Sequence, residues 1–209
     1  MAKIDRLPFN LSGQLGDYVY YKWKDKNVVR KKPSPRISEP SPAELQARSK
    51  FGFMTQFLLP LNALFYESFR YNNMSPLNKA LSVNLNHVLP DSYPDWEVDF
   101  SKLLLGEGNI PGLTDLAVDV QIPGHLIFNW NGKSRRWGTT GNDLIYVAVY
   151  CEHLDMWLTH FGSAYRKEGS FVLDAEAFSG FPVHVYLGLI SGFRGGSSDS
   201  QYLGMVVIG

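Results

Sequence analysis

The sequence predicts a mainly β protein: an immunoglobulin- or fibronectin III-like antiparallel β-sandwich with an N-terminal β-hairpin arm and one or two helices. Two observations lead to this prediction. From about residue 91 onward, short β-prone runs alternate with turn-forming clusters, and no helical period lies between them. Before that point, an alternating aromatic segment is followed by proline-rich sequence and then by apolar residues at helical spacing.

Residues 1–40 form the predicted basic arm. Two β-rich stretches, Tyr18–Trp23 and 28–30, flank a polar turn at 24–27, which is typical of a β-hairpin. A lone two-stranded hairpin is marginally stable in water, so its apolar side chains need a covering surface. The prolines that follow make the segment up to residue 40 an extended linker.

A helical segment is predicted over residues 41–90. Ser41, Pro42 and Glu44 have the residue types and spacing of a capping box, so a helix should begin there. Its apolar positions step by three and four, and Pro60 should kink or divide it. We expect this face to pack against the sandwich or against a neighbouring subunit, and a second helix is possible around 77–85.

Residues 91–209 form the predicted sandwich. Its expected strands are 96–100, 116–122, 126–130, 144–152, 155–160, 170–173, 183–191 and 202–208. Trp130 is a candidate central core tryptophan. Cys151 lies within an apolar run and is expected to be a buried, inert thiol.

Charge is unevenly distributed along a chain whose net charge is zero. Residues 1–50 hold eleven Lys or Arg against five Asp or Glu, whereas residues 51–209 hold nine against fifteen. We expect an acidic rim at the entry to the sandwich that complements the basic arm; its residues are Asp91, Asp95, Glu97 and Asp99. The arm could dock on its own chain or on another, and the charge pattern leaves both possibilities open.

Several residues of the arm, of the start of the helical segment and of the C-terminal part carry a family resemblance. They are Gly13, Gly16, Val19, Trp23, Lys24, Arg30, Pro33, Leu45, Arg48 and Phe51, together with the later run Ser198-x-Ser200-x-Tyr202-Leu203-Gly204. This pattern resembles an uncharacterised bacterial family of domains of unknown function, although Asp25 stands where that family usually has a turn glycine. The arm is also similar to openings found in phage and tail-like structural proteins. The resemblance implies no catalytic residue.

The sequence offers little for enzymatic chemistry. The five histidines form no metal-binding spacing, and one cysteine cannot complete a zinc set. We therefore predict a protein that is not an enzyme and that holds no cofactor and no metal. The start of the chain lacks the apolar stretch of a secretory signal and no run is long enough to span a membrane, so we expect cytoplasmic synthesis. An assembly built from the chain could still leave the cell as a virion or exported particle.

The leading functional prediction is a structural or assembly subunit that docks through its arm, with other copies or further subunits as partners. The interaction residues expected in the arm are Tyr18, Tyr20, Trp23, Lys24, Val28, Arg30, Lys31 and Lys32. One alternative is a glycan- or peptide-binding sandwich that uses Trp130, Trp137 and Trp157. A second, less favoured alternative is nucleic-acid contact through the basic arm, which an acidic remainder would oppose.

Overall fold

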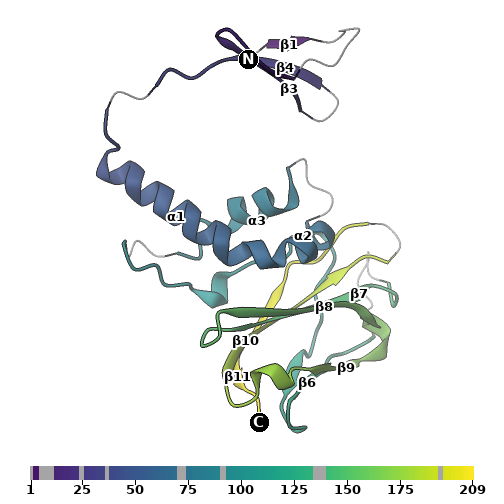
Figure 1. The fold of residues 1–209 in the computed structure, drawn as a ribbon. Helices are drawn as coiled ribbons and strands as arrows, with labels where there is room; N and C mark the ends of the chain where they lie inside the picture. Colours follow the sequence, from purple (N-terminus) through teal and green to yellow (C-terminus); the bar gives the residue numbers. More distant parts are fainter. Residues whose placement is uncertain are drawn as a thin grey trace. The chain divides into compact units, whose positions relative to one another are not determined.

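The structure is a computed structural model (Figure 1), and it describes residues 2–4, 12–23, 26–35, 38–69, 74–89, 93–133, 140–192 and 195–209. The chain forms two compact units, Met1–Ser41 and Pro42–Gly209. The helical segment and the sandwich therefore belong to the same unit.

The N-terminal unit contains a four-stranded antiparallel sheet in the order β1-β4-β3-β2. Its strands are β1 (Ala2–Ile4), β2 (Gly13–Leu15), β3 (Tyr18–Trp23) and β4 (Lys26–Lys31). The predicted hairpin is confirmed as β3 and β4, but its connection is shorter than expected because Trp23 pairs with Lys26. β2 and β1 extend it on either side, so the hairpin does not stand alone. Gly16 supplies the positive φ, 57°, of the turn into β3.

The second unit begins with the helical segment, which consists of α1 (Pro42–Leu58), the 3-10 turn η1 (Leu59–Leu61), α2 (Asn62–Ser68) and α3 (Pro76–Asn84). α1 starts at the predicted position, and the helix changes to a 3-10 turn around Pro60, whose ring cannot continue the backbone hydrogen bonding. Phe51 is one of the apolar residues at helical spacing that we expected to pack inward, but it is half exposed. None of the described helices is both long and apolar enough to cross a bilayer.

Seven strands form two antiparallel sheets in the same unit. The strands are β5 (Ala117–Asp119), β6 (His125–Asn129), β7 (Leu144–Cys151), β8 (Met156–Tyr165), β9 (Ser170–Asp174), β10 (Pro182–Ile190) and β11 (Gln201–Val207). One sheet has the order β11-β10-β7-β8 and the other β5-β6-β9. The chain crosses between sheets after β6, β8 and β9, which is the connectivity of an immunoglobulin-type sandwich. The predicted sandwich is thus confirmed.

One predicted strand is wrong. Residues 96–100 alternate apolar and acidic side chains as a strand would, yet they form an irregular segment that leads into η2 (Phe100–Lys102). Their apolar side chains pack into the core beneath the helices instead of joining a sheet. The alternation of apolar and acidic residues fits this packing as well as it fits a strand, because every second side chain of the segment points toward the core.

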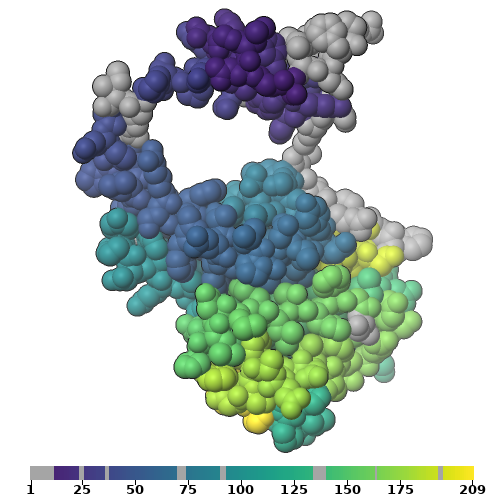
Figure 2. Space-filling model, viewed as in Figure 1, coloured from purple at the N-terminus to yellow at the C-terminus, as the bar shows by residue number. Residues whose placement is uncertain are grey.

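The unit has three layers: the helical segment, the four-stranded sheet and the three-stranded sheet (Figure 1). The space-filling view shows the helical segment, in blue, lying on the green and yellow sandwich (Figure 2). Successive side chains of β7 enter different cores. Ile145, Val147 and Val149 pack between the two sheets, whereas Tyr146 and Ala148 pack under the helices. Burial on both faces explains why the run 144–151 is apolar throughout. The helical segment therefore packs on its own sandwich, one of the two expected alternatives.

Two further expectations concern the core between the sheets. Trp130 is buried there, with 6% of its surface exposed, and its Nε1 donates to the Arg166 carbonyl at 2.7 Å. Cys151 is also fully buried. The central tryptophan and the buried thiol are both confirmed.

Candidate functional site

Strand register sorts the predicted interaction residues of the N-terminal sheet onto two faces. Tyr18 pairs with Lys31 and with Leu15, so these three side chains lie on one face. Tyr20 lies on this face as well. Trp23 and Arg30 project from the opposite face, because their positions along the strands alternate with those of Tyr18 and Lys31. The predicted interaction residues therefore do not form one surface.

Exposure differs strongly among these residues. Leu15 is 71% exposed, Trp23 57% and Tyr18 51%, which are high values for apolar side chains. Val28 is only 3% exposed, so it serves the interior of its own unit rather than a docking surface. Lys24 lies outside the described residues. Among the described basic residues of strands β3 and β4, Lys22 and Lys31 lie on the face of Tyr18, whereas Lys26 and Arg30 lie on the opposite face.

The acidic rim is only partly placed. Asp91 lies outside the described residues, whereas Asp95 and Glu97 are exposed. Asp99 accepts hydrogen bonds from the Ser101 hydroxyl at 2.5 Å and forms an ion pair with Lys102 at 2.7 Å. These contacts, led by the Lys102 bond, hold the pKa of Asp99 below its ordinary value. Part of the charge of this rim is thus already neutralised within the unit.

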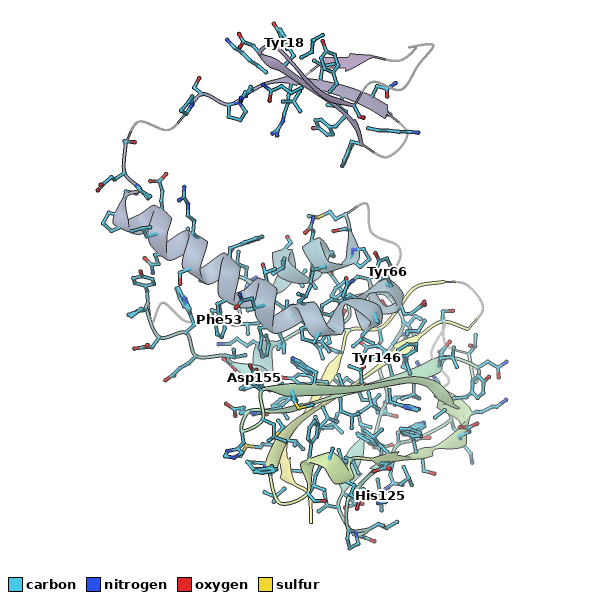
Figure 3. All side chains as sticks on the ribbon, in the orientation of Figure 1. Tyr18, Phe53, Tyr66, His125, Tyr146 and Asp155 are labelled. Atoms are coloured by element: carbon cyan, nitrogen blue, oxygen red, sulfur yellow. The ribbon has the colours of Figure 1, made fainter. Side chains whose placement is uncertain are left out.

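Glu97 also lines a groove of about 640 Å³ that was not predicted. The groove lies between α1, the irregular segment before η2 and the turn that joins β7 to β8. Phe53 on α1 and Asp155 at this turn mark two of its walls (Figure 3). We call it the aromatic–carboxylate groove.

Six aromatic side chains line the aromatic–carboxylate groove: Phe53, Phe57, Trp96, Phe100, Tyr150 and Trp157. They contact one another closely. The Phe57 ring meets Tyr150 edge-on at 5.2 Å and Trp157 at 5.5 Å between centroids. Tyr150 and Trp157 lie 4.7 Å apart. Such contacts fix the ring faces in place.

Three carboxylates, Glu97, Glu152 and Asp155, line the same groove. The Tyr150 hydroxyl donates to Asp155 Oδ1 at 2.7 Å, and burial together with this acceptor raises the pKa of Tyr150. Glu152 Oε1 lies 2.8 Å from His184 Nε2. No Lys, Arg or His is found among the described residues that line the groove.

His184 holds Glu152 in position. Its Nδ1 lies 2.8 Å from the Tyr202 hydroxyl, so an Nε2–H tautomer donates to Glu152 and accepts from Tyr202. The ring also stacks on Phe100, with centroids 3.7 Å apart. Both ring nitrogens are engaged, so the histidine orients the carboxylate rather than presenting an open base.

The other predicted candidates are not brought together. Trp130 is buried in the core and Trp157 lines the aromatic–carboxylate groove, while Trp137 lies outside the described residues. Trp130 and Trp157 therefore do not lie together in one ligand site. Within the described parts of the chain, no three His, Cys, Asp or Glu side chains are arranged to hold a metal ion.

The model of DUF6266, a family of unknown function, matches residues 10–204. The chain belongs to this family. The expected membership of a family of unknown function is thereby confirmed. No curated protein matches the DUF6266 chain.

Among solved structures, the chain is similar to fibronectin type III domains. The chicken CNTN1 FN1–FN3 fragment aligns with a TM-score of 0.38 and 10% identity over 49% of this chain and 33% of that one. The fn3 domain of the human collagen alpha-1(XX) chain aligns with a TM-score of 0.34 and 16% identity, covering 49% of this chain and 89% of that one. The fn3 domain of human contactin 1 aligns with a TM-score of 0.35 and 11% identity, covering 49% of this chain and 82% of that one.

The C-terminal run that prompted the family resemblance joins the layers of the DUF6266 chain. The Ser198 hydroxyl accepts from the Leu189 amide at 3.0 Å, and the Ser200 hydroxyl accepts from the Leu105 amide at 2.9 Å. Tyr202 is the hydrogen-bond partner of His184. These residues thus have structural roles that connect β10 and β11 to the segment beneath the helices.

Sequence reasoning missed the aromatic–carboxylate groove because its residues come from three separate segments. Phe53 was assigned only to a packing face, and residues 96–100 only to a strand. One signal was available: the turn Glu152–Asp155 combines two carboxylates with an aromatic residue on each side. Only the fold shows that α1 lies beside this turn and completes the groove.

Proposed function

We propose that this DUF6266 chain is a non-enzymatic assembly subunit, in which the N-terminal sheet of one copy docks on the second unit of another copy. The observation that carries the proposal is the separation of charge between two compact units. Met1–Ser41 holds nine Lys or Arg against four Asp or Glu, whereas Pro42–Gly209 holds eleven against sixteen. Units of opposite charge steer each other into contact.

The face of the N-terminal sheet that bears Leu15, Tyr18 and Lys31 is the proposed docking face. It combines exposed apolar area with a positive charge, and tyrosine is enriched at protein interfaces. Asp95 and Glu97 are its proposed acceptors, because both are exposed in the acidic unit. The proline-containing linker gives the N-terminal unit reach beyond its own chain.

Light scattering on the purified full-length chain tests the proposal. We expect dimers or larger species at about 50 mM salt and dissociation at about 500 mM, because salt screens exposed charges. The variant Lys31→Glu should dissociate the assembly at low salt. Lys133→Glu changes an equally exposed lysine of the second unit and should leave it intact. A full-length chain that stays monomeric at low salt would show the proposal to be wrong.

The finer form of the proposal is a virion-like, tail-like or filament-type assembly. It extends the resemblance that the sequence of the arm suggested to openings in phage and tail-like structural proteins. Head-to-tail docking of one unit on the next copy builds rings or filaments. Electron microscopy of the low-salt assembly should therefore reveal repeating particles or filaments, and discrete dimers would contradict this form.

A further inference from the structure

The geometry points to the aromatic–carboxylate groove as a binding site for an organic cation, which we assign to an arginine or lysine side chain from the N-terminal unit of a second copy. The inference takes the source of this cation from the proposed function. The site itself is argued from the groove alone.

Charge is the first argument. Glu97, Glu152 and Asp155 give the groove three carboxylates, and the described lining residues include no compensating cation. The contacts that these carboxylates make offset their negative charge only in part. His184 Nε2 lies 2.8 Å from Glu152 Oε1, and the Tyr150 hydroxyl that donates to Asp155 is neutral. A cation that enters the groove therefore meets a negative field that these contacts offset only in part.

The aromatic wall is the second argument. A cation within about 6 Å of a ring centroid is attracted by the negative face of the ring. The structure already contains one such contact beside the groove, because Lys50 Nζ lies 5.8 Å from the Trp96 centroid. Tyr150 and Trp157 line the groove without such a lysine in any contact the structure records. Guanidinium groups suit this combination, since they stack on rings and bind carboxylates at their edge.

The size of the groove is the third argument. A volume of about 640 Å³ lies within the range of sites that take a small molecule, so the groove has room for a long cationic side chain. A second copy is the occupant that the charges favour, because its N-terminal unit carries a surplus of Lys and Arg and exposes Lys31 on the proposed docking face. Glu97 belongs both to the groove and to the proposed acceptor residues, so one docking event could use both.

Binding of a free probe to the full-length chain tests the site. N-acetyl-L-arginine amide carries the guanidinium group, and N-acetyl-L-citrulline amide is its neutral isostere. Both are titrated while the indole N–H resonances of Trp96 and Trp157 are followed by NMR. We expect arginine amide to shift these resonances and to bind about tenfold more tightly than citrulline amide. Equal affinity of the two probes would overturn the inference.

Variants locate the binding. The double variant Glu97→Gln and Glu152→Gln removes two charges, while the glutamine oxygen at 152 can still accept from His184. We expect its affinity for arginine amide to fall about tenfold. Glu176→Gln is the matched control, because Glu176 is exposed and does not line the groove. A double variant that binds arginine amide as the unaltered chain does would place the site elsewhere and overturn the inference.

Light scattering and arginine-amide titration of the single variant Glu152→Gln, which keeps the proposed acceptor Glu97, test the source of the cation. Loss of self-association at low salt, together with loss of arginine binding, supports the assigned occupant. Self-association that persists after arginine binding is lost would overturn that occupant and leave the proposed function standing. Arginine binding in a chain that never self-associates would overturn both the occupant and the proposed function. A response of the indoles to neutral oligosaccharides but not to arginine amide would instead make the groove a glycan site.

Discussion

Arg166 and Asp143 form an ion pair inside the sandwich, with 3.0 Å between Nε and Oδ2 and side chains only 2% and 1% exposed. The remaining donors of Arg166 reach the carbonyls of Gly112 and Pro111, and Thr140 donates to the carboxylate. The pair thus links three loops of the sandwich. Its members are buried yet satisfied, as buried charges must be.

Removing one partner of this pair should destabilise the protein strongly. In Arg166→Met the Asp143 carboxylate stays buried without its cation, which costs about 3–5 kcal/mol of the free energy of unfolding. Urea unfolding followed by fluorescence measures it. The double variant Arg166→Met with Asp143→Leu should recover much of the loss, because no lone charge remains. A single variant as stable as the unaltered chain would contradict this role.

Gly188 lies opposite Tyr146 on the paired strands β10 and β7. A Cβ atom at Gly188 would collide with the Tyr146 ring, so Gly188→Ala should cost about 1–3 kcal/mol through overpacking. Gly52 is a matched control on α1, where a Cβ meets nothing within 4 Å. Gly52→Ala should stabilise the protein by about 0.5–1 kcal/mol, since alanine favours helix. Thermal unfolding should therefore shift in opposite directions for the two variants.

Asn84 connects α3 to Leu104, which lies in the segment that follows η2. Its Nδ2 donates to the carbonyls of Ala80 and Leu104, and its Oδ1 accepts from the Leu104 amide at 2.8 Å. Asn84→Ala should cost about 1–3 kcal/mol, because the partly buried Leu104 amide would be left without its side-chain acceptor. The exposed Asn86 provides the control, and Asn86→Ala should change stability by less than about 0.5 kcal/mol. Equal effects of the two substitutions in urea unfolding would contradict this account.

The sandwich could be predicted because its strands carry their own local signals. Seven of the eight expected strands occur close to their predicted positions, and the turn at Pro60 follows from one residue. β1 and β2 could not be anticipated, because each has three residues and little β-prone sequence. They gain strand geometry by pairing with β4 and β3, which is a tertiary effect.

The aromatic–carboxylate groove shows more clearly what local sequence patterns do not predict. Phe53, Glu97 and Asp155 are separated by more than forty residues at each step, and no local pattern connects them. Phe57 could be predicted to face inward, but not that Tyr150 and Trp157 would receive it. Periodicity predicts which face of an element is buried, whereas packing decides which surfaces meet.

Alkaline pH should unfold the protein through its buried tyrosines. Burial raises the pKa of Tyr146 and of Tyr186 well above the ordinary value of 10.0. Above pH 10 the unfolded chain therefore releases protons that the folded chain retains, so the stability present below that pH is lost as the pH rises. Each of these two tyrosines should lower the free energy of unfolding by about 1.4 kcal/mol per pH unit in that range.

Tyr146→Phe provides the sharpest test of this pH dependence. The Tyr146 hydroxyl is buried and has no hydrogen-bond partner among the described residues, so its removal should leave stability at neutral pH unchanged or raised. Above pH 10 the free energy of unfolding of this variant should fall less steeply with pH, by the contribution of one tyrosine. Circular dichroism and tyrosinate absorbance, recorded together during alkaline titration, measure both effects. An unchanged alkaline slope in this variant would contradict the assignment, because the most deeply buried phenol would then contribute nothing to it.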